Sequence, residues 1–380
     1  MELAPTETQR LVQETARRLA TEVFAPRAAA LDRSHRFPHE NVKALAEVGL
    51  LGVNVSAAYG GSEAGAVAYA LAMMEVARAC ASTAVTMAVT NMVGEIIERF
   101  GTEAQKRRHI PKLTSGAYAA GAFALSEPHC GSDAAALRTR ARKEGDRWVL
   151  DGEKMWITSG DVAGVIVVWA RTGGEGARGI SCFLVEGDTP GLSAGKPEEK
   201  MGQRGSSTVP LSFEGCEIPE DALLGEVGQG FKIAMTALDG GRIGIASLAT
   251  GIGRAALDAA VRYAGERVAF GRPIAKFQAI QWKIADMATK LDAAELLALK
   301  AAYLKENGRP FTEAASMAKL FASEAANEAC LDAIQIHGGY GYVDEFPVER
   351  YFRDARVTTL YEGTSEIQRL VIARHVLNAL

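Results

Sequence analysis

Lys143-Glu144-Gly145-Asp146-Arg147-Trp148-Val149-Leu150 is a β-hairpin signal within this 380-residue chain, whose pattern changes from helical to β near residue 119. A polar turn containing Gly145 and Asp146 leads into an apolar run, which is typical of a hairpin turn followed by a strand. Similar short runs lie at residues 165–169, 180–185 and 209–213. We therefore expect a middle antiparallel β domain, residues 119–228, because no helical segments alternate with these strands as a parallel sheet requires.

The segment before this domain, residues 1–118, is helical by pattern. Thr6 and Thr102 each precede a glutamine by three residues, which is the spacing of a capping box, and each opens a helical stretch. Residues 62–100 are rich in Ala and Met and poor in charge, which indicates buried helices. We expect core positions rather than cofactor contacts for Met73, Met74, Met87 and Met92.

The segment after the β domain, residues 229–380, returns to long helical patterns. These patterns cover residues 233–268, 275–307 and 312–337. Asn307-Gly308-Arg309-Pro310 is a clear break between two of them. Long helices joined by short loops predict an antiparallel bundle. The expected fold class is thus α+β, in the order helical, β, helical.

Composition excludes several classes of function. The net charge is −4 and no long Lys/Arg run occurs, which argues against nucleic-acid binding. The five cysteines are odd in number and lack CxxC spacing, which indicates reduced thiols, no metal site and a cytoplasmic location. No secretory signal pattern opens the chain, and no apolar run of about 18 residues predicts a membrane span.

Tyr361-Glu362-Gly363-Thr364-Ser365 has the pattern of a loop that leads into a helix. Gly363 loosens the backbone directly after a carboxylate, and Thr364 or Ser365 can cap the helix that follows. Glu362 is therefore held at a helix N-terminus and is a candidate catalytic base. On this segment alone, an ordinary loop glutamate is an equally good interpretation.

Two segments of the β domain suit a planar polar ligand. Residues 123–133 turn through Pro and Gly and expose backbone N–H groups and two Ser hydroxyls. Trp156, at the expected end of a strand, can flank a heteroaromatic ring, although a lone Trp is more often a core residue. His129 and Cys130 are adjacent, but we predict no metal site or nucleophile there because no further ligand or base has a suitable spacing.

Two glycine-rich segments lie within the helical C-terminal part. Residues 335–341, Gln-Ile-His-Gly-Gly-Tyr-Gly, end a helix with glycines that allow a ligand to approach closely. His337 is either a general base or, as we favour, a cap of that helix C-terminus. Residues 251–256 match the G-x-G-x-x-A dinucleotide fingerprint but lie inside a helical pattern. We therefore expect those glycines to serve helix packing and not a Rossmann site.

Together these segments resemble the acyl-CoA dehydrogenases, a family of FAD-dependent enzymes, over essentially the whole chain. Residues 125–133 resemble the family's first motif, although Cys130 stands where another small residue is usual. Residues 335–345, with Arg350 and Asp354, resemble the second motif. The resemblance implies an α domain, a β domain and a C-terminal four-helix bundle. It also implies α,β-desaturation of an acyl-CoA thioester.

By resemblance, Glu362 is the base that removes the α proton. Some members carry the base on another helix, at the position of Gly241, and glycine cannot serve there. The resemblance implies FAD contacts from Phe123, Ala124, Leu125, Ser126, Gly131, Ser132, Trp156, Ile157, Thr158, Arg267, Phe270, Gln278, Gln335, Gly338, Gly339, Thr364 and Glu366. It implies substrate contacts from Ser132, Asp239, Arg242, Tyr361 and Gly363.

Residues 238–246 most resemble short-chain members, so we expect a butyryl-CoA-like substrate, with branched short-chain substrates (isobutyryl-CoA, 2-methylbutyryl-CoA) as the alternative. A glutaryl-CoA dehydrogenase is disfavoured because residues 81–94 contain no Lys or Arg. The alternative from another functional class is a non-catalytic flavoprotein scaffold. The family also implies electron-transfer flavoprotein as the acceptor. It implies a homotetramer, a dimer of dimers, in which a neighbouring subunit supplies some FAD contacts.

Overall fold

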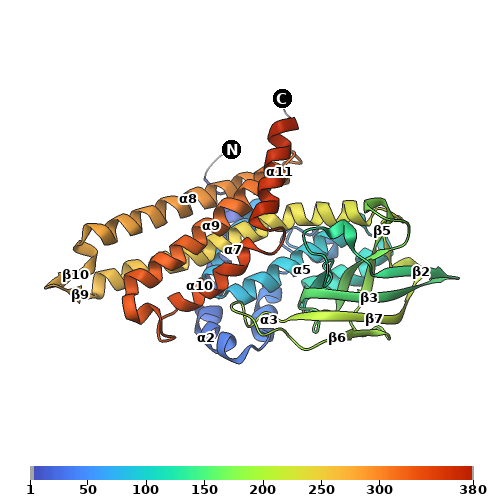
Figure 1. The fold of residues 1–380 in the computed structure, drawn as a ribbon, viewed down its shortest axis with the longest axis horizontal. Helices are drawn as coiled ribbons and strands as arrows, with labels where there is room; N and C mark the ends of the chain where they lie inside the picture. Colours follow the sequence, from blue (N-terminus) through green and yellow to red (C-terminus); the bar gives the residue numbers. More distant parts are fainter. Residues whose placement is uncertain (1–3, 379–380) are drawn as a thin grey trace.

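The computed structural model describes residues 4–378. Helices from both ends of the chain lie side by side, and a β domain stands against one end of this helical part (Figure 1). The proposed domain limits at 118/119 and 228/229 fall in the loops between α6 and β1 and between β8 and α7. The outer ends of the proposed domains, residues 1–3 and 379–380, lie outside the described residues.

The N-terminal part is helical, as the capping boxes predict. In α1 and α6, Thr6 and Thr102 each accept a hydrogen bond from the backbone N–H of a glutamine three residues later. Met73, Met74, Met87 and Met92 are all buried, which confirms them as core. The elements are α1 (Glu7–Leu19), a π-helical turn (Ala20–Phe24), α2 (Ala25–Ser34), α3 (His39–Glu47), α4 (Ala66–Ala79), α5 (Ala81–Phe100) and α6 (Glu103–Thr114).

The middle part is an eight-stranded sheet in the order β6-β7-β3-β2-β4-β5-β8, with β1 beside β4. The hairpin expected at residues 143–146 is present, and Gly145 takes the left-handed conformation with φ 65°. Most pairs are antiparallel, but β1 and a single residue pair of β2 run parallel to β4. The strands are β1 (Gly121–Ala124), β2 (Arg140–Glu144), β3 (Arg147–Thr158), β4 (Val165–Arg171), β5 (Ile180–Glu186), β6 (Leu192–Ala194), β7 (Thr208–Pro219) and β8 (Leu223–Leu224).

Three long helices dominate the C-terminal part, and α7, with 37 residues, extends from the sheet to the far end of the bundle (Figure 1). Helices α10 and α11 both pack on α9. A small hairpin, β9 (Val268–Ala269) with β10 (Arg272–Pro273), closes the far end. The helices are α7 (Gly230–Glu266), α8 (Gln278–Glu306), α9 (Thr312–His337), α10 (Val348–Arg356) and α11 (Ser365–Asn378).

The dinucleotide-like glycines at 251–253 lie inside α7, where they allow close packing of helices. A Cβ at Gly251 would overlap the backbone of Met74 on α4, and one at Gly253 would overlap Leu291 on α8. Contacts this close are possible only without a side chain. The structure therefore confirms helix packing, and not nucleotide binding, for this motif. Within the described residues, no helix is long and apolar enough to cross a membrane.

Candidate active site

The loop between α10 and α11 presents Glu362 to the middle of α7. Glu362 and Gly363 take left-handed conformations with φ of 52° and 86°, which is costly for Glu362. Thr364 Oγ1 accepts the backbone N–H of Ile367, so Thr364 caps α11 as predicted. The Glu362 Oε2 lies where a Cβ of Gly241 would stand. The absence of a side chain at Gly241 is thus what allows the carboxylate to rest against α7.

One carboxylate oxygen of Glu362 is shielded from water, and the residue as a whole is half-buried. Its Oε2 is buried and has no hydrogen-bond partner among the described residues. Burial raises the pKa of Glu362 to about 7, against a smaller opposing effect from the positive charges of Lys319 and Arg242. A carboxyl group with a pKa near neutrality is suited to proton transfer. The structure therefore gives Glu362 the environment that a general base requires.

Three side chains hold this loop, two through its backbone carbonyls and one through the side chain of Tyr361. Lys319 of α9 donates from Nζ to the Gly363 carbonyl at 2.7 Å. Gln368 of α11 donates from Nε2 to the carbonyls of Glu362 and Gly363 at 3.1 and 2.8 Å. Gln203 of the β domain donates to the Tyr361 hydroxyl at 3.2 Å. Sequence reasoning missed Lys319, Gln203 and Gln368; the one signal in the sequence was the lysine that directly follows the Ala-rich stretch 314–318.

Arg242 and Asp239, predicted to contact substrate, form a pair one turn apart on α7. Arg242 is buried and donates to Asp239 Oδ1 at 2.6 Å and to Ser316 Oγ at 3.3 Å. Thr312 donates its hydroxyl to the other oxygen of Asp239 at 2.6 Å. The structure thus brings Asp239, Arg242 and Glu362 to the same stretch of α7. Ser132, a further predicted substrate contact, lies on an exposed loop of the β domain.

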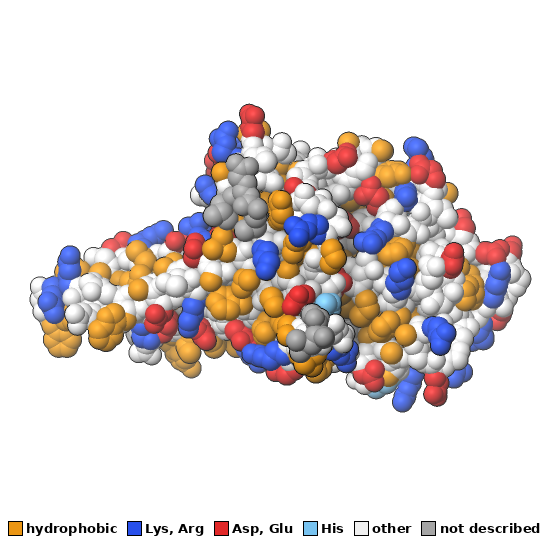
Figure 2. All heavy atoms as spheres, turned by 90° about the horizontal axis from the view of Figure 1, so that it is seen from above, with side chains coloured by type: hydrophobic (Ala, Val, Ile, Leu, Met, Phe, Trp, Pro, Cys, Tyr) orange, Lys and Arg blue, Asp and Glu red, His pale blue; other side chains and the backbone are white. Residues whose placement is uncertain are grey.

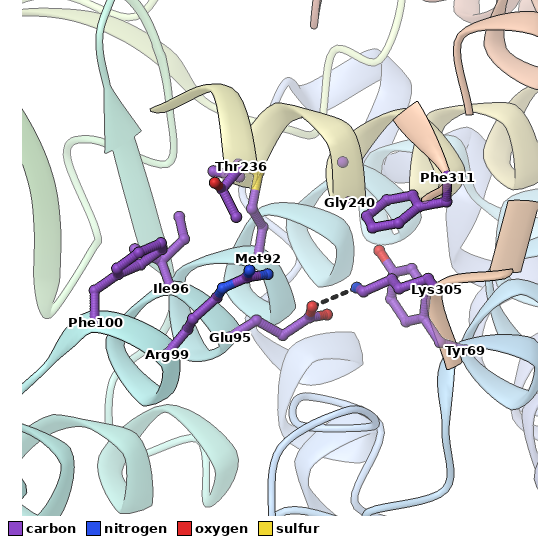
Figure 3. A pocket seen from close by; sticks show the side chains of 12 residues that line it. Tyr69, Met92, Glu95, Ile96, Arg99, Phe100, Thr236, Gly240, Lys305 and Phe311 are labelled. Atoms are coloured by element: carbon purple, nitrogen blue, oxygen red, sulfur yellow. Dashed lines mark hydrogen bonds and ion pairs between the residues drawn. The ribbon is translucent and has the colours of Figure 1, made fainter. Parts of the chain in front are cut away.

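A cavity of about 60 Å³ lies beside Gly240 and Gly241 (Figure 3). Helix α5 contributes Glu95, which forms an ion pair with Lys305 from the end of α8. Arg99 also lines the cavity, together with Tyr69, Met92, Ile96, Phe100, Thr236, Ala237 and Phe311. Two basic side chains therefore reach this cavity, although residues 81–94 contain none.

The predicted flavin-ring residues lie where β1 and β3 end. Phe123 packs on Trp169 with ring centroids 4.2 Å apart, and the backbone N–H of Met155 donates to the Ser126 carbonyl at 2.9 Å. Trp156 is 60% exposed and has φ 64°, which is unusual for a large aromatic residue at the end of a strand. An exposed ring in a strained conformation is a feature that a stacked ligand explains.

Hydrogen bonds connect this strand end to the base loop. Ser159, just after β3, donates its backbone N–H to the Ser207 carbonyl at 2.8 Å. The same loop holds Gln203, which contacts Tyr361. The side of the sheet that carries Ile157 and Thr158 is thus joined to the loop that carries Glu362.

A second group of predicted FAD contacts lies at the far end of the bundle. Arg267, Gly338 and Gly339 line an open cleft of about 630 Å³, and the Arg267 guanidinium lies 5.8 Å from the centre of the Tyr340 ring. Side chains built at Gly338 and Gly339 would meet only open space. Phe270, between β9 and β10, is 96% exposed. Gln278 and Gln335 are also exposed at this end, at the start of α8 and near the end of α9.

These two groups lie toward opposite ends of the chain's long axis, near the start and the end of α7 (Figure 1). Gly241 and Arg267 are 26 residues apart on one continuous helix. At a rise of 1.5 Å per residue, that is about 39 Å. The features of each group still fit parts of FAD: an exposed Trp for the ring system, and an open glycine-lined cleft with an arginine for phosphate or adenine.

Two further predictions have clear outcomes. His337 is buried, stacks on Tyr263 at 4.2 Å and shares a 2.8 Å hydrogen bond with the Ala333 carbonyl, so it caps the end of α9 at the edge of the glycine-lined cleft. Burial lowers the pKa of His337, which keeps the ring neutral. His129 and Cys130 do have a third potential ligand nearby, Glu127, which the sequence spacing did not reveal.

The Glu127 carboxylate already has hydrogen-bond partners within the protein. The Glu127 carboxylate accepts from the buried Lys154 Nζ at 2.8 Å and from the backbone N–H groups of Arg138 and Thr139. Its negative charge is therefore balanced by a lysine, as buried charges generally require. The cluster is a structural ion pair beneath the loop at residues 126–133.

Comparisons with known proteins agree with this geometry. Three family models match consecutive parts of the chain: the acyl-CoA dehydrogenase N-terminal domain over residues 6–117, the middle domain over 122–216 and the C-terminal domain over 228–377. The chain belongs to the acyl-CoA dehydrogenase family. This confirms the resemblance read from the motifs, and it makes the protein an oxidoreductase that acts on the CH–CH bond of an acyl-CoA.

Individual relatives are similar over nearly their whole length. The mitochondrial short-chain specific acyl-CoA dehydrogenase of Mus musculus is 53% identical over 98% of this chain and 91% of its own. Butyryl-CoA dehydrogenase from Megasphaera elsdenii has a TM-score of 0.97 and 41% identity, covering 99% of this chain and 100% of that one. A chain in a structure of the electron transferring flavoprotein of Acidaminococcus fermentans has a TM-score of 0.97 and 43% identity, with 99% and 100% coverage.

Proposed function

We propose that this chain desaturates a short-chain acyl-CoA to the trans-2-enoyl-CoA, with Glu362 as the catalytic base and FAD as the cofactor. The observation that carries the proposal is the buried Glu362 Oε2, unpartnered and resting against Gly241 beside the cavity. A carboxylate oxygen that lacks donors has a raised proton affinity, and burial raises its pKa further. An α C–H beside a thioester is a weak acid, so its removal requires such a base.

The protein's own groups carry the proton transfer. Ionised Glu362 takes the α proton on its carboxylate, and the negative charge that develops on the thioester oxygen needs preorganised donors, each commonly worth about 3 to 4 kcal/mol. The family resemblance assigns one of these to the backbone N–H of Glu362. The clamp on the adjoining carbonyls by Lys319 and Gln368 supports this assignment because it fixes the loop backbone. Bound FAD supplies the acceptor for the hydride that leaves the β carbon.

The small cavity supports a short acyl group. Its volume of about 60 Å³ favours a short acyl group over a long one. A butyryl group is therefore the proposed substrate class, and isobutyryl or 2-methylbutyryl groups are the alternative. Because Arg99 and Lys305 reach the cavity, glutaryl-CoA belongs among the substrates to be compared.

The partners are proposed from the same resemblance. Electron-transfer flavoprotein is the proposed acceptor, which the match to a chain in the Acidaminococcus fermentans structure supports. A homotetramer is the proposed assembly, because a neighbouring subunit would bring the bundle-end group of FAD contacts to the ring-side group. Catalytic use, and not a scaffold role, is supported by the intact Glu362 and its environment.

Anaerobic titration of the FAD-loaded protein tests the proposal. We expect butyryl-CoA to bleach the flavin absorbance faster than isobutyryl-, 2-methylbutyryl-, octanoyl- or glutaryl-CoA. Fastest bleaching by a branched substrate would move the assignment to that class. If none of these substrates bleached the flavin, desaturation of short acyl-CoA would be disproved.

Glu362→Gln separates the base from the binding site in the same assay. The variant is expected to keep FAD and to bind butyryl-CoA, while flavin reduction falls by at least about a thousandfold. Reduction at the unmodified rate would show that another group removes the proton.

A further inference from the structure

Lys319 is a fully buried lysine, and the proposed reaction steps make no use of its charge. It lies on α9, with no exposed surface, among Ala318, Ala322 and other small residues of that helix. Burying an ammonium group is costly unless it is paired and hydrogen-bonded. The Lys319 Nζ nevertheless reaches the carbonyl of Gly363, directly after the base, at 2.7 Å. A buried charge aimed at one loop indicates a role for that loop.

The positive charge of Lys319 acts on the Glu362 carboxylate although the two side chains form no direct ion pair. Among the described residues, no ion pair within 4.0 Å joins Glu362 to Lys319 or to Arg242. Arg242 pairs with Asp239 at 2.6 Å instead, which offsets much of its charge. Lys319 has no such carboxylate partner within the described residues, so its positive charge is the less compensated of the two.

We infer that Lys319 is a positioning residue for the reaction, which fixes the loop backbone through the Gly363 carbonyl and whose charge favours the ionised form of Glu362. The inference rests on the proposed role of Glu362 as base. Two requirements compete at this site. Burial makes the carboxylate a stronger base but opposes its ionisation. A nearby cation without direct contact restores ionisation and leaves the carboxylate oxygen free for the substrate proton.

Other titratable and charged groups face this pair from each neighbouring element. Helix α7 brings Arg242 and Asp239, and α11 brings Glu366, which is exposed. Glu324 lies one turn further along α9 and pairs with Arg369 of α11. Tyr69 of α4 and Tyr361 also sense the Glu362 charge, and burial raises the pKa of both so that they stay neutral.

Opposing effects set the charge of Lys319 itself. Burial lowers the pKa of Lys319 to about 8, while the charge of Glu362 works in the opposite direction. Lys319 is therefore protonated in the range below pH 8, where Glu362 ionises. Within that range, its charge is available to the base.

The test compares three variants that separate charge from hydrogen bonding. Lys319→Gln keeps a donor for the Gly363 carbonyl and removes the charge, Lys319→Arg keeps the charge, and Lys319→Met removes both. The readout is the pH profile of flavin reduction by butyryl-CoA. We expect Lys319→Gln to move the acidic limb to higher pH, so that the rate at pH 6 falls about three- to tenfold while the limiting rate at high pH changes much less. Lys319→Arg should restore the limb, and Lys319→Met should show the same shift as Gln with a lower limiting rate.

A second readout does not depend on turnover. The Glu362 carboxyl band, obtained as the infrared difference between each protein and its Glu362→Gln counterpart, can be titrated in the FAD-loaded enzyme without substrate. The pH midpoint of this band should rise in Lys319→Gln and return to the wild-type value in Lys319→Arg. If wild type is not reduced by any acyl-CoA but this midpoint still shifts, the proposed function fails and the coupling of the two residues stands.

An unshifted profile and midpoint in Lys319→Gln would overturn the inference. Lys290→Gln is the matched control: Lys290 joins α8 to α9 through Glu328 at the surface, so its loss should change neither readout. If Lys319→Gln does not fold, Lys319→Met carries the comparison, because replacing a buried charge by an apolar side chain of similar volume is often neutral for stability.

Discussion

At the scale of single residues, Glu362 combines features that are each unfavourable for folding. Its backbone is in the left-handed region, one carboxylate oxygen is buried without a donor, and the side chain lies on a bare stretch of helix. Conformations of this kind cost of order 1 to 3 kcal/mol each and persist where the surroundings enforce them. Here Lys319, Gln368 and Gln203 supply that enforcement through the loop backbone and Tyr361.

The pH dependence of flavin reduction follows from the environment of Glu362. Burial raises the pKa of Glu362 to about 7, and the base must be ionised to accept a proton. The rate of reduction at low butyryl-CoA concentration should therefore rise as pH increases from 6 to 8, with a midpoint near 7. Stopped-flow absorbance measures this directly. A flat profile down to pH 5 would mean that the carboxyl is well solvated in the free enzyme.

Ionisation of Glu362, which the reaction requires, should lower the free energy of unfolding. The pKa of Glu362 is about 7 in the folded protein and ordinarily 4.5, so the folded state holds the proton more tightly. Between these values the folded state binds more protons than the unfolded state, and stability falls as pH rises. Glu362→Gln should thus stabilise the protein by about 1 to 3 kcal/mol at pH 8 and by little at pH 4.5. Calorimetry of both proteins at the two pH values is the measurement, and equal effects at both would contradict it.

At the scale of elements, α7 and the loop before α11 are shaped for each other. The helix supplies a glycine where the loop supplies a carboxylate, and a side chain at Gly241 would occupy the place of Glu362 Oε2. By resemblance, some family members carry their base on this helix at the position of Gly241, where the present chain has no side chain. One carboxylate fits in this space, and its source is set by which element lacks a side chain.

Gly241→Ala is the direct test of this complementarity. The added methyl group displaces the carboxylate, and a shift of about 1 Å in a reacting group can cost on the order of a hundredfold in rate. We expect flavin reduction to fall by about that factor while FAD content is unchanged. Gly265→Ala is the matched control in the same helix, because a Cβ there meets open space. Equal rates for the two variants would show that the carboxylate has room to move.

The elements themselves follow from local sequence signals, and their tertiary contacts do not. The capping boxes at Thr6 and Thr102 and the hairpin at Gly145 were predictable because each depends on residues close in sequence. The parallel pairing of β1 with β4 was not, because the partners lie more than 40 residues apart and no local pattern encodes which strands meet. For the same reason, Glu362 was found as a loop carboxylate, while the clamp by Gln203 and Lys319 was not.

At the scale of the whole molecule, the end of the helical bundle that carries β9 and β10 has an apolar surface. The narrow end that carries β9 and β10 exposes hydrophobic side chains (Figure 2). Phe270 is 96% exposed, Val268 is 56% exposed and Tyr342 is 87% exposed. Exposed apolar groups of this size in one region mark interaction surfaces. This end also holds the second group of predicted FAD contacts, about 39 Å along α7 from the base.

The proposed homotetramer would make assembly and cofactor binding depend on the same residues. If the bundle end of one chain completes the cofactor site of another, then Phe270→Asp, which places a charge in that contact, should weaken both together. We expect light scattering to show a smaller particle and gel filtration to remove FAD. Secondary structure should be unchanged, because Phe270, at the tip of the hairpin, packs mainly on Phe277. Val261→Asp, at an exposed position of α7 before that hairpin, is the comparison for a charge introduced elsewhere on the bundle. A Phe270→Asp protein that dissociates and keeps its FAD would show that each chain binds its cofactor alone.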